Sequence, residues 1–192
     1  MLGKLWKKLK AKIKPQEEGK RAAAKLFISE WEVDEIVEFH FFNSDYTHLR
    51  EFDSRVSYWQ AVVKAIIKAE SDFNIISTFW EKDLGNNGYD KVTGRKYLSE
   101  GLMQLSYSDA RYYDACEFDW DLDKNKDEND VTKTIFTPTR NIGCGLAILN
   151  SMVRRNGTFI YDKGNYWAVL KPSNKRHKVF QAALQNYLLQ VK

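Results

Sequence analysis

The most constraining feature of this sequence is an apolar stripe of helical period that ends in a glutamate. Between positions 55 and 70 apolar residues recur at spacings of three and four, the period of one buried helix face: Val56, Trp59, Val63, Ile66 and Ile67. Glu70 continues that face, and the residues at 71–74 indicate a helix end. The sequence therefore predicts a buried helix over residues 55–70 with a carboxyl group in its last turn.

Three effects are expected to act on Glu70 at this position. Apolar neighbours disfavour the ionised carboxylate, the carbonyl end of the helix repels negative charge, and Asp72 lies close in sequence. Each effect raises the pKa of Glu70, which suits a general acid that works near neutral pH. On position alone, the alternative is a partly exposed carboxylate at a frayed helix end.

Further motifs follow in a fixed order. Glu70-Ser71 closes the helix, Gly101-Leu102-Met103-Gln104 comes after a loop, Asn141-Ile142-Gly143-Cys144-Gly145 lies in an apolar helix, and Asn165-Tyr166-Trp167 is a late aromatic segment. This order resembles the superfamily of soluble lytic transglycosylases and goose-type lysozymes, and it covers roughly residues 60–172. The resemblance implies a mostly helical α+β protein with a lysozyme-like fold and a small β-hairpin region at the cleft.

The resemblance also implies an activity, which is cleavage of the MurNAc-GlcNAc β-1,4 bond of peptidoglycan glycan strands. Glu70 would be the catalytic acid and then the base, without a metal or an organic cofactor. The family pattern implies that Met103 makes apolar contact with the sugar, that Gln104 hydrogen-bonds it, and that Asn141 supports the site. The full set of implied substrate-binding residues is Ser71, Glu100, Gly101, Met103, Gln104, Asn141 and Tyr166, with Trp167 as the other candidate for the aromatic wall.

Glu100 is a departure from the family pattern, which commonly has a small or apolar residue there. If its carboxylate faced the 2-position of the bound sugar, it would favour a free amino group and therefore deacetylated glycan. A deacetylated sugar cannot assist with its acetyl group, so the outcome would shift toward hydrolysis. A solvent-facing Glu100 is the alternative.

The sequence leaves open whether the enzyme is a transglycosylase or a hydrolase. Hydrolysis needs a second carboxylate that positions water, and Asp83 and Asp90 are the candidates before Gly101. A non-catalytic glycan-binding module on a lysozyme-like body is the alternative from a different functional class. The two candidates can be separated by the variant Glu70→Gln. An enzyme would lose wall cleavage in this variant, whereas a glycan-binding module would not depend on Glu70 in this way.

Positive charge is concentrated at the N-terminus. Residues 1–20 hold seven Lys against two Glu, so the other 172 residues sum to −1. We therefore expect a basic amphipathic arm or linker over 1–20 and one catalytic domain over 21–192. Residues 1–14 could lie on an anionic membrane or wall surface, whereas the domain has no nucleic-acid motif. The implied substrate places the protein in the periplasm, in the cell envelope or outside the cell, although no signal peptide is visible.

Other patterns give coarser expectations. Helices are predicted over residues 22–42, from Pro138 to about Asn156, and from Ser173 onward, with β structure over 84–98. The acidic loop 121–130 has only part of a calcium-loop pattern, so a solvated loop is the default interpretation. Cys116 and Cys144 fit either one disulfide or two buried thiols, with a slight preference for thiols.

Overall fold

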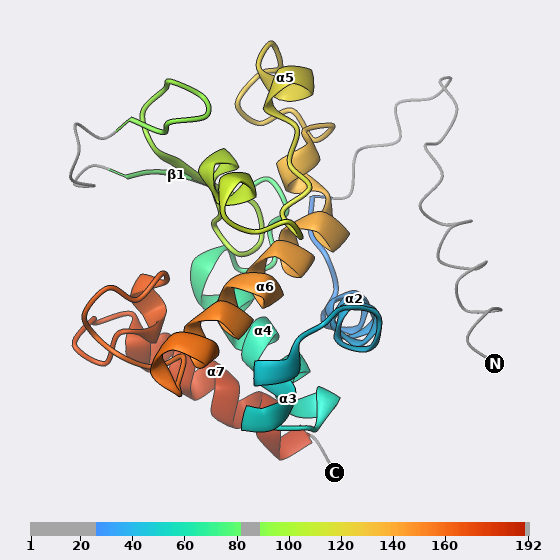
Figure 1. Cartoon of the computed structure of the whole chain (residues 1–192), viewed down its shortest axis with the longest axis vertical. Coiled ribbons are helices and arrows are strands. Elements are labelled where there is room, and N and C mark those ends of the chain that lie inside the picture. The colour runs from blue at the N-terminus through green and yellow to red at the C-terminus, as the bar shows by residue number, and fades with distance from the viewer. Residues whose placement is uncertain (1–25, 82–88, 191–192) are drawn as a thin grey trace, which may run out of the picture.

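The computed structural model describes residues 26–81 and 89–190 (Figure 1). The α-helices there are α2 (Glu30–Asn43), α3 (Thr47–Phe52), α4 (Val56–Glu70), α5 (Trp120–Asp123), α6 (Pro138–Asn156) and α7 (His177–Gln190). Short 3-10 helices are η1 (Tyr107–Arg111), η2 (Thr134–Phe136) and η3 (Ala168–Leu170), and β1 (Thr78–Trp80) pairs with β2 (Leu98–Glu100). A mostly helical α+β architecture is therefore confirmed. The predicted N-terminal arm and Asp83 lie outside the described residues.

Helix α4 lies at the centre of the core, and it ends at Glu70 as the sequence predicts. It is buried on nearly every side from Trp59 to Ile67, rather than along one stripe. The reason is that α2 and α7 both pack against it. Even Lys64 is buried, and its ammonium pairs with Asp34 of α2 at 2.9 Å. The core thus fixes the position of the carboxyl group at the end of α4.

Helix α6 crosses in front of α4 in Figure 1 and packs against α2 and α3. Its start at Pro138 and its left-handed cap at Gly157, with φ of 65°, match the sequence prediction. Cys144 of α6 forms a disulfide with Cys116. The preference for free thiols was therefore wrong, because spacing alone cannot show that the loop before α5 returns to α6.

Two other helices begin later than the sequence predicts. Residues 26–29 run in an extended conformation instead of a helix, with Ile28 N–H bonded to the Phe73 carbonyl at 3.1 Å. Ser29 then caps α2 in a capping box with Glu32. Helix α7 begins at His177 rather than at Ser173. The Ser173 N–H donates a hydrogen bond to Asp162 Oδ1 at 2.8 Å.

The small sheet is a hairpin with two different faces. Its register pairs Thr78 with Glu100, Phe79 with Ser99, and Trp80 with Leu98. Because directly opposite residues in an antiparallel pair share a face, Phe79 and Ser99 lie on one side. Leu98 and Glu100 lie on the other side, since neighbouring side chains alternate along a strand. In the described part of the predicted β region at 84–98, Tyr89 and Lys96 form an isolated antiparallel bridge and Leu98 begins β2. Residues 82–88 are outside the described part.

No helix within residues 26–81 and 89–190 has the length and hydropathy of a membrane span.

Candidate active site

Glu70 is the best candidate for a functional acid in this structure. Its side chain is only 7% exposed. Burial is the main cause that raises the pKa of Glu70, and the negative charge of Glu81 raises it further. The Arg176 guanidinium and the Val169 N–H lower it in part. The predicted direction of the pKa shift is confirmed.

Asp72 does not supply the repulsion that the sequence led us to expect. It adopts a left-handed conformation, with φ of 51°, directly after the helix end. This turn directs its carboxylate into solvent, where it is 72% exposed and pairs with Lys68 at 2.5 Å. The acidic neighbour that acts on Glu70 is Glu81 instead.

Glu81 is a site residue that the sequence analysis missed. It follows β1 directly, and the Ser99 hydroxyl donates a hydrogen bond to its Oε1 at 2.9 Å. Ser99 and Phe79 share the hairpin face, so this face carries the second carboxylate. The available signal was alternation: Phe79 and Glu81 are two residues apart on an extended segment.

Asp90 does not have the water-positioning role that was expected of it. It is only 3% exposed. Its Oδ1 accepts the N–H groups of Val92 and Thr93, and its Oδ2 accepts that of Ser108. Asp90 therefore stabilises the turn before β2, because its oxygens are bonded to the backbone. Asp83, the other candidate, lies outside the described residues.

Arg176 is a second residue that the sequence analysis missed. Its Nη2 lies 3.2 Å from Glu70 Oε2, and a guanidinium nitrogen also donates to the Ala69 carbonyl. The Arg176 side chain is 44% exposed, so a buried acid is paired with a solvent-accessible cation. It precedes α7 and is brought to Glu70 by the packing of α7 against α4. No sequence pattern links the two positions.

The turn that follows β2 is built by internal contacts. Gly101 has φ of +78°, which favours glycine, and a Cβ there would lie 2.4 Å from Asn141 Nδ2. Asn141 is completely buried and accepts the Met103 N–H at 2.8 Å while donating to the Ile135 carbonyl. The absence of a side chain at Gly101 therefore lets the backbone lie close to Asn141, and Asn141 supports the turn.

Met103 and Gln104 do not present their side chains as the family pattern implies. Met103 is fully buried against α6 at Gly145, so it belongs to the core and cannot contact a sugar from an open surface. Gln104 is 9% exposed, and its amide nitrogen donates to the Ser77 and Gly101 carbonyls. These two residues shape the turn beside the site.

Ser71 has a local role. It is buried, and its hydroxyl donates to the Ile67 carbonyl, one turn back in α4. The hydroxyl therefore helps to close the helix end, which is a different role from the substrate contact expected of it.

Of the two aromatic candidates, Tyr166 is the accessible one. It is 36% exposed, whereas Trp167 is 2% exposed and donates from Nε1 to the Met103 carbonyl at 2.7 Å. The Tyr166 hydroxyl donates to Asp109 Oδ2 at 2.5 Å. Burial is the main cause that raises the pKa of Tyr166, and the negative charges of Asp109 and Glu81 raise it further. Because the charge of Glu81 raises the pKa of both Glu70 and Tyr166, we assign the three residues to one candidate site.

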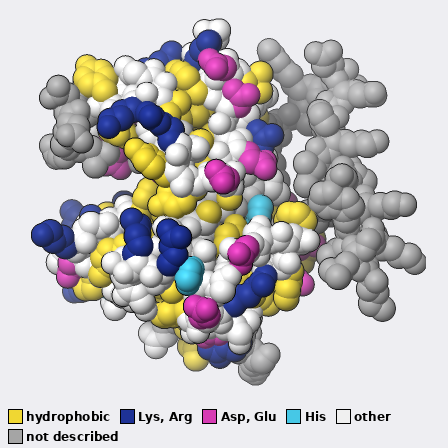
Figure 2. All heavy atoms as spheres, in the orientation of Figure 1, with side chains coloured by type: hydrophobic (Ala, Val, Ile, Leu, Met, Phe, Trp, Pro, Cys, Tyr) yellow, Lys and Arg dark blue, Asp and Glu magenta, His cyan; other side chains and the backbone are white. Residues whose placement is uncertain are grey.

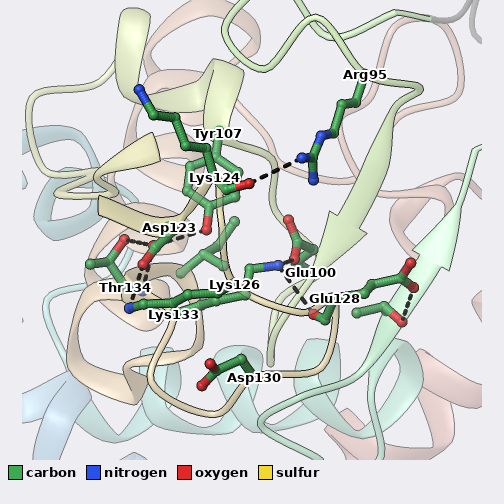
Figure 3. Close-up of polar contacts among 12 residues, drawn as sticks. Arg95, Glu100, Tyr107, Asp123, Lys124, Lys126, Glu128, Asp130, Lys133 and Thr134 are labelled. Carbon is green, nitrogen blue, oxygen red and sulfur yellow. Dashed lines mark hydrogen bonds and ion pairs between the residues drawn. The ribbon is translucent and has the colours of Figure 1, made fainter. Parts of the chain in front are cut away.

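Glu100 lies on the hairpin face opposite to Glu81, and both expectations for it were wrong. It is 2% exposed and forms a buried ion pair with Lys133, which also donates to the Glu128 carbonyl at 3.1 Å (Figure 3). Burial raises the pKa of Glu100 to about 7, although Lys133 opposes the shift. Its carboxylate lines a separate small pocket with Tyr107 and other residues. It is neither in solvent nor beside a sugar at Glu70.

The partial calcium motif is used for protein contacts instead. Asp123 is buried, and its Oδ2 accepts from the Tyr107 hydroxyl and the Thr134 N–H, while Oδ1 pairs with Lys126 (Figure 3). Among the residues described, no group of His, Cys, Asp and Glu side chains is arranged to hold a metal ion.

Comparisons with known proteins give a fold and nothing finer. No family model matches the chain, and no curated protein matches its sequence. Solved structures of a protein named Bd0314 DslA do match. The wild type in form 2 has a TM-score of 0.54 at 22% identity, over 82% of this chain and 88% of that one. Two glutamate-to-glutamine mutants of it match as well, with TM-scores of 0.54 and 0.53 at 22% and 23% identity. They cover 82% and 90% of this chain and 88% and 95% of theirs.

Proposed function

We propose that this protein is a peptidoglycan-cleaving glycosidase with a lysozyme-like fold, in which Glu70 is the general acid. The observation that carries the proposal is a buried carboxyl group at a helix end, whose pKa is raised by burial and by the charge of a second carboxylate, Glu81. Glycoside cleavage uses such a pair, one carboxyl group to protonate the leaving oxygen and one to assist attack. The sequence resemblance to lytic transglycosylases and goose-type lysozymes names the substrate class.

The spacing of the two carboxylates gives independent support. The glutamates exchanged in the two DslA mutants lie eleven positions apart in that protein. Glu70 and Glu81 have the same separation in this chain. A common fold with the same spacing suggests that the two pairs are equivalent.

The proposed reaction is hydrolysis. Glu70 gives its proton to the glycosidic oxygen as the bond to the anomeric carbon breaks, and Glu81 accepts a proton from the water that attacks that carbon. Ser99 orients Glu81 through their 2.9 Å hydrogen bond. We place the glycan in the hollow at the left of Figure 2, between the hairpin and the segment 161–170, which are located by their places in Figure 1.

The disulfide supports a location outside the cytoplasm. Disulfides persist in oxidising compartments such as the periplasm and the extracellular space, and Cys116–Cys144 joins two separate parts of the fold. A periplasmic, envelope or secreted enzyme would meet glycan strands there.

The test is cleavage of purified sacculi by wild type, Glu70→Gln and Glu81→Gln. We expect Glu70→Gln to lower the rate by at least about 100-fold, with unchanged folding by circular dichroism. Glu51→Gln is the matched control, since Glu51 is 68% exposed and lies in α3, at the end of the molecule opposite the hairpin in Figure 1. Full activity in Glu70→Gln would overturn the assignment.

Product masses test the reaction type. Hydrolysis gives reducing ends, whereas transglycosylation gives anhydro ends that are lighter by one water. Reducing ends that disappear in Glu81→Gln would support the role of Glu81. Anhydro ends from the wild type would make the protein a lytic transglycosylase.

One observation favours a non-catalytic glycan-binding module as the second candidate. The 3.2 Å pair with Arg176 stabilises the ionised form of Glu70, which cannot donate a proton. A module of this kind would bind sacculi without cleaving them. Binding without any released fragment from the wild type would favour it.

A further inference from the structure

A cluster of positive charge borders the candidate active site. Residues 161–178 contain one Asp and five basic residues, Lys163, Lys171, Lys175, Arg176 and Lys178. This segment therefore has a net charge of +4, equal to that of the whole chain. We call these five residues the basic lip. In Figure 2 Lys and Arg side chains gather along the lower edge of the hollow at left, over this part of the chain.

The lysines of the basic lip do not stabilise the fold through ion pairs. Elsewhere Lys64, Lys126 and Lys133 pair with Asp34, Asp123 and Glu100. In contrast, no ion pair in residues 26–81 and 89–190 involves Lys163, Lys171, Lys175 or Lys178, and all but the half-buried Lys171 are exposed. Neighbouring like charges repel one another. Such a cluster produces a positive field that attracts an anionic ligand.

The basic lip is continuous with the chemistry at Glu70. The Val169 N–H acts on the Glu70 carboxylate and lowers its pKa, and Lys171 is two residues further on. Arg176 lies within 3.2 Å of Glu70 while 44% of its side chain remains exposed. A guanidinium has five N–H donors, so Arg176 can bind a second carboxylate from the solvent side. A ligand on the lip would therefore be held beside the acid.

We propose that the basic lip binds the carboxylates on the lactyl and peptide substituents of a peptidoglycan strand. This inference rests on the proposed function and names the feature of the substrate that is recognised. The strand carries such substituents on alternate sugars, so one can lie on the lip while the adjacent glycosidic bond lies at Glu70. A substrate carboxylate on Arg176 competes with Glu70 for the guanidinium, which frees Glu70 to bind its proton.

The experiment compares two substrates that differ only in charge. One is soluble glycan strands with free carboxylates, and the other is the same strands after carbodiimide and ammonia have converted the carboxylates to amides. For the wild type we expect KM to be about three- to tenfold lower on the free carboxylates. The difference should shrink at 0.5 M salt, since screening weakens exposed charges.

Variants locate the effect on the lip. Lys171→Gln/Lys175→Gln should remove most of the difference in KM between the two substrates. Lys124→Gln/Arg140→Gln is the matched control, because it removes two exposed positive charges at other places and should keep the difference. Arg176 stays intact in both, since it contacts Glu70.

The outcomes separate this inference from the proposed function. Equal KM on both substrates, with cleavage that depends on Glu70, would overturn the proposed binding role of the basic lip. The proposed glycosidase activity would be unaffected by that result. Loss of the difference in both double variants would also overturn the binding role, because total charge and not the lip would be responsible. If neither the wild type nor any variant cleaves either substrate, the role of the basic lip can still be tested by binding. Tryptophan fluorescence would compare the affinity of Glu70→Gln for the charged strands and for the amidated strands. Equal binding would then exclude that role.

Discussion

Two buried glutamates of this protein, Glu70 and Glu100, are alike in chemistry and different in access. Each has a pKa raised by burial, and each is paired with one cation that opposes the shift. The cation beside Glu100 is Lys133, whose side chain is 5% exposed, whereas the one beside Glu70 is Arg176, which is 44% exposed. The cation beside Glu100 is therefore buried with it, whereas the cation beside Glu70 is open to solvent.

The difference shows that a raised pKa alone does not identify a catalytic acid. Burial raises the pKa of Glu100 to about 7, yet its carboxylate holds the loop before α6 against β2. One strand separates the two roles: Ser99 of β2 contacts Glu81 on the side of Glu70, and Glu100 points to the opposite face. Activity is therefore expected to depend on Glu70, and stability on the pair Glu100–Lys133.

Breaking the pair Glu100–Lys133 should reduce stability more than any other change considered. Lys133→Met leaves an uncompensated carboxylate at a 2% exposed position, so the free energy of unfolding at pH 8 should fall by about 3–5 kcal/mol. Urea denaturation would measure it. Glu100→Leu/Lys133→Met should recover most of the loss, because no charge is left buried. An unchanged stability in Lys133→Met would show that the pair is not closed in solution.

A second effect concerns pH. Since the folded-state pKa of Glu100 is about 7 and its ordinary value is 4.5, the stability it contributes is present below pH 4.5 and lost as pH rises through 7. Across this window the wild type should lose about 3 kcal/mol relative to Glu100→Gln. The comparison of the two proteins cancels the titrating groups that do not interact with Glu100. Parallel curves would mean that Glu100 titrates normally.

The smallest effect is expected at Arg176. Its positive charge lowers the pKa of Glu70, so Arg176→Gln should raise that pKa and keep the acid protonated to higher pH. The alkaline limb of the pH profile of kcat/KM should therefore move upward, while Arg176→Lys, which keeps the charge, should move it less. The measurement needs only initial rates on sacculi. A limb that moves downward would contradict the electrostatic role of Arg176.

Features that depend on local order could be predicted from the sequence alone. The apolar period of α4 placed Glu70 at a buried helix end, and the Pro138 start and Gly157 cap bounded α6, because helix period and caps are encoded by near neighbours. Which groups lie beside Glu70 depends instead on how distant segments pack. The register of the hairpin positions Glu81, and the packing of α7 against α4 brings Arg176 to Glu70. The same packing buried Met103 and enclosed Glu100 with Lys133, since contacts between distant segments depend on how elements pack and leave no local pattern.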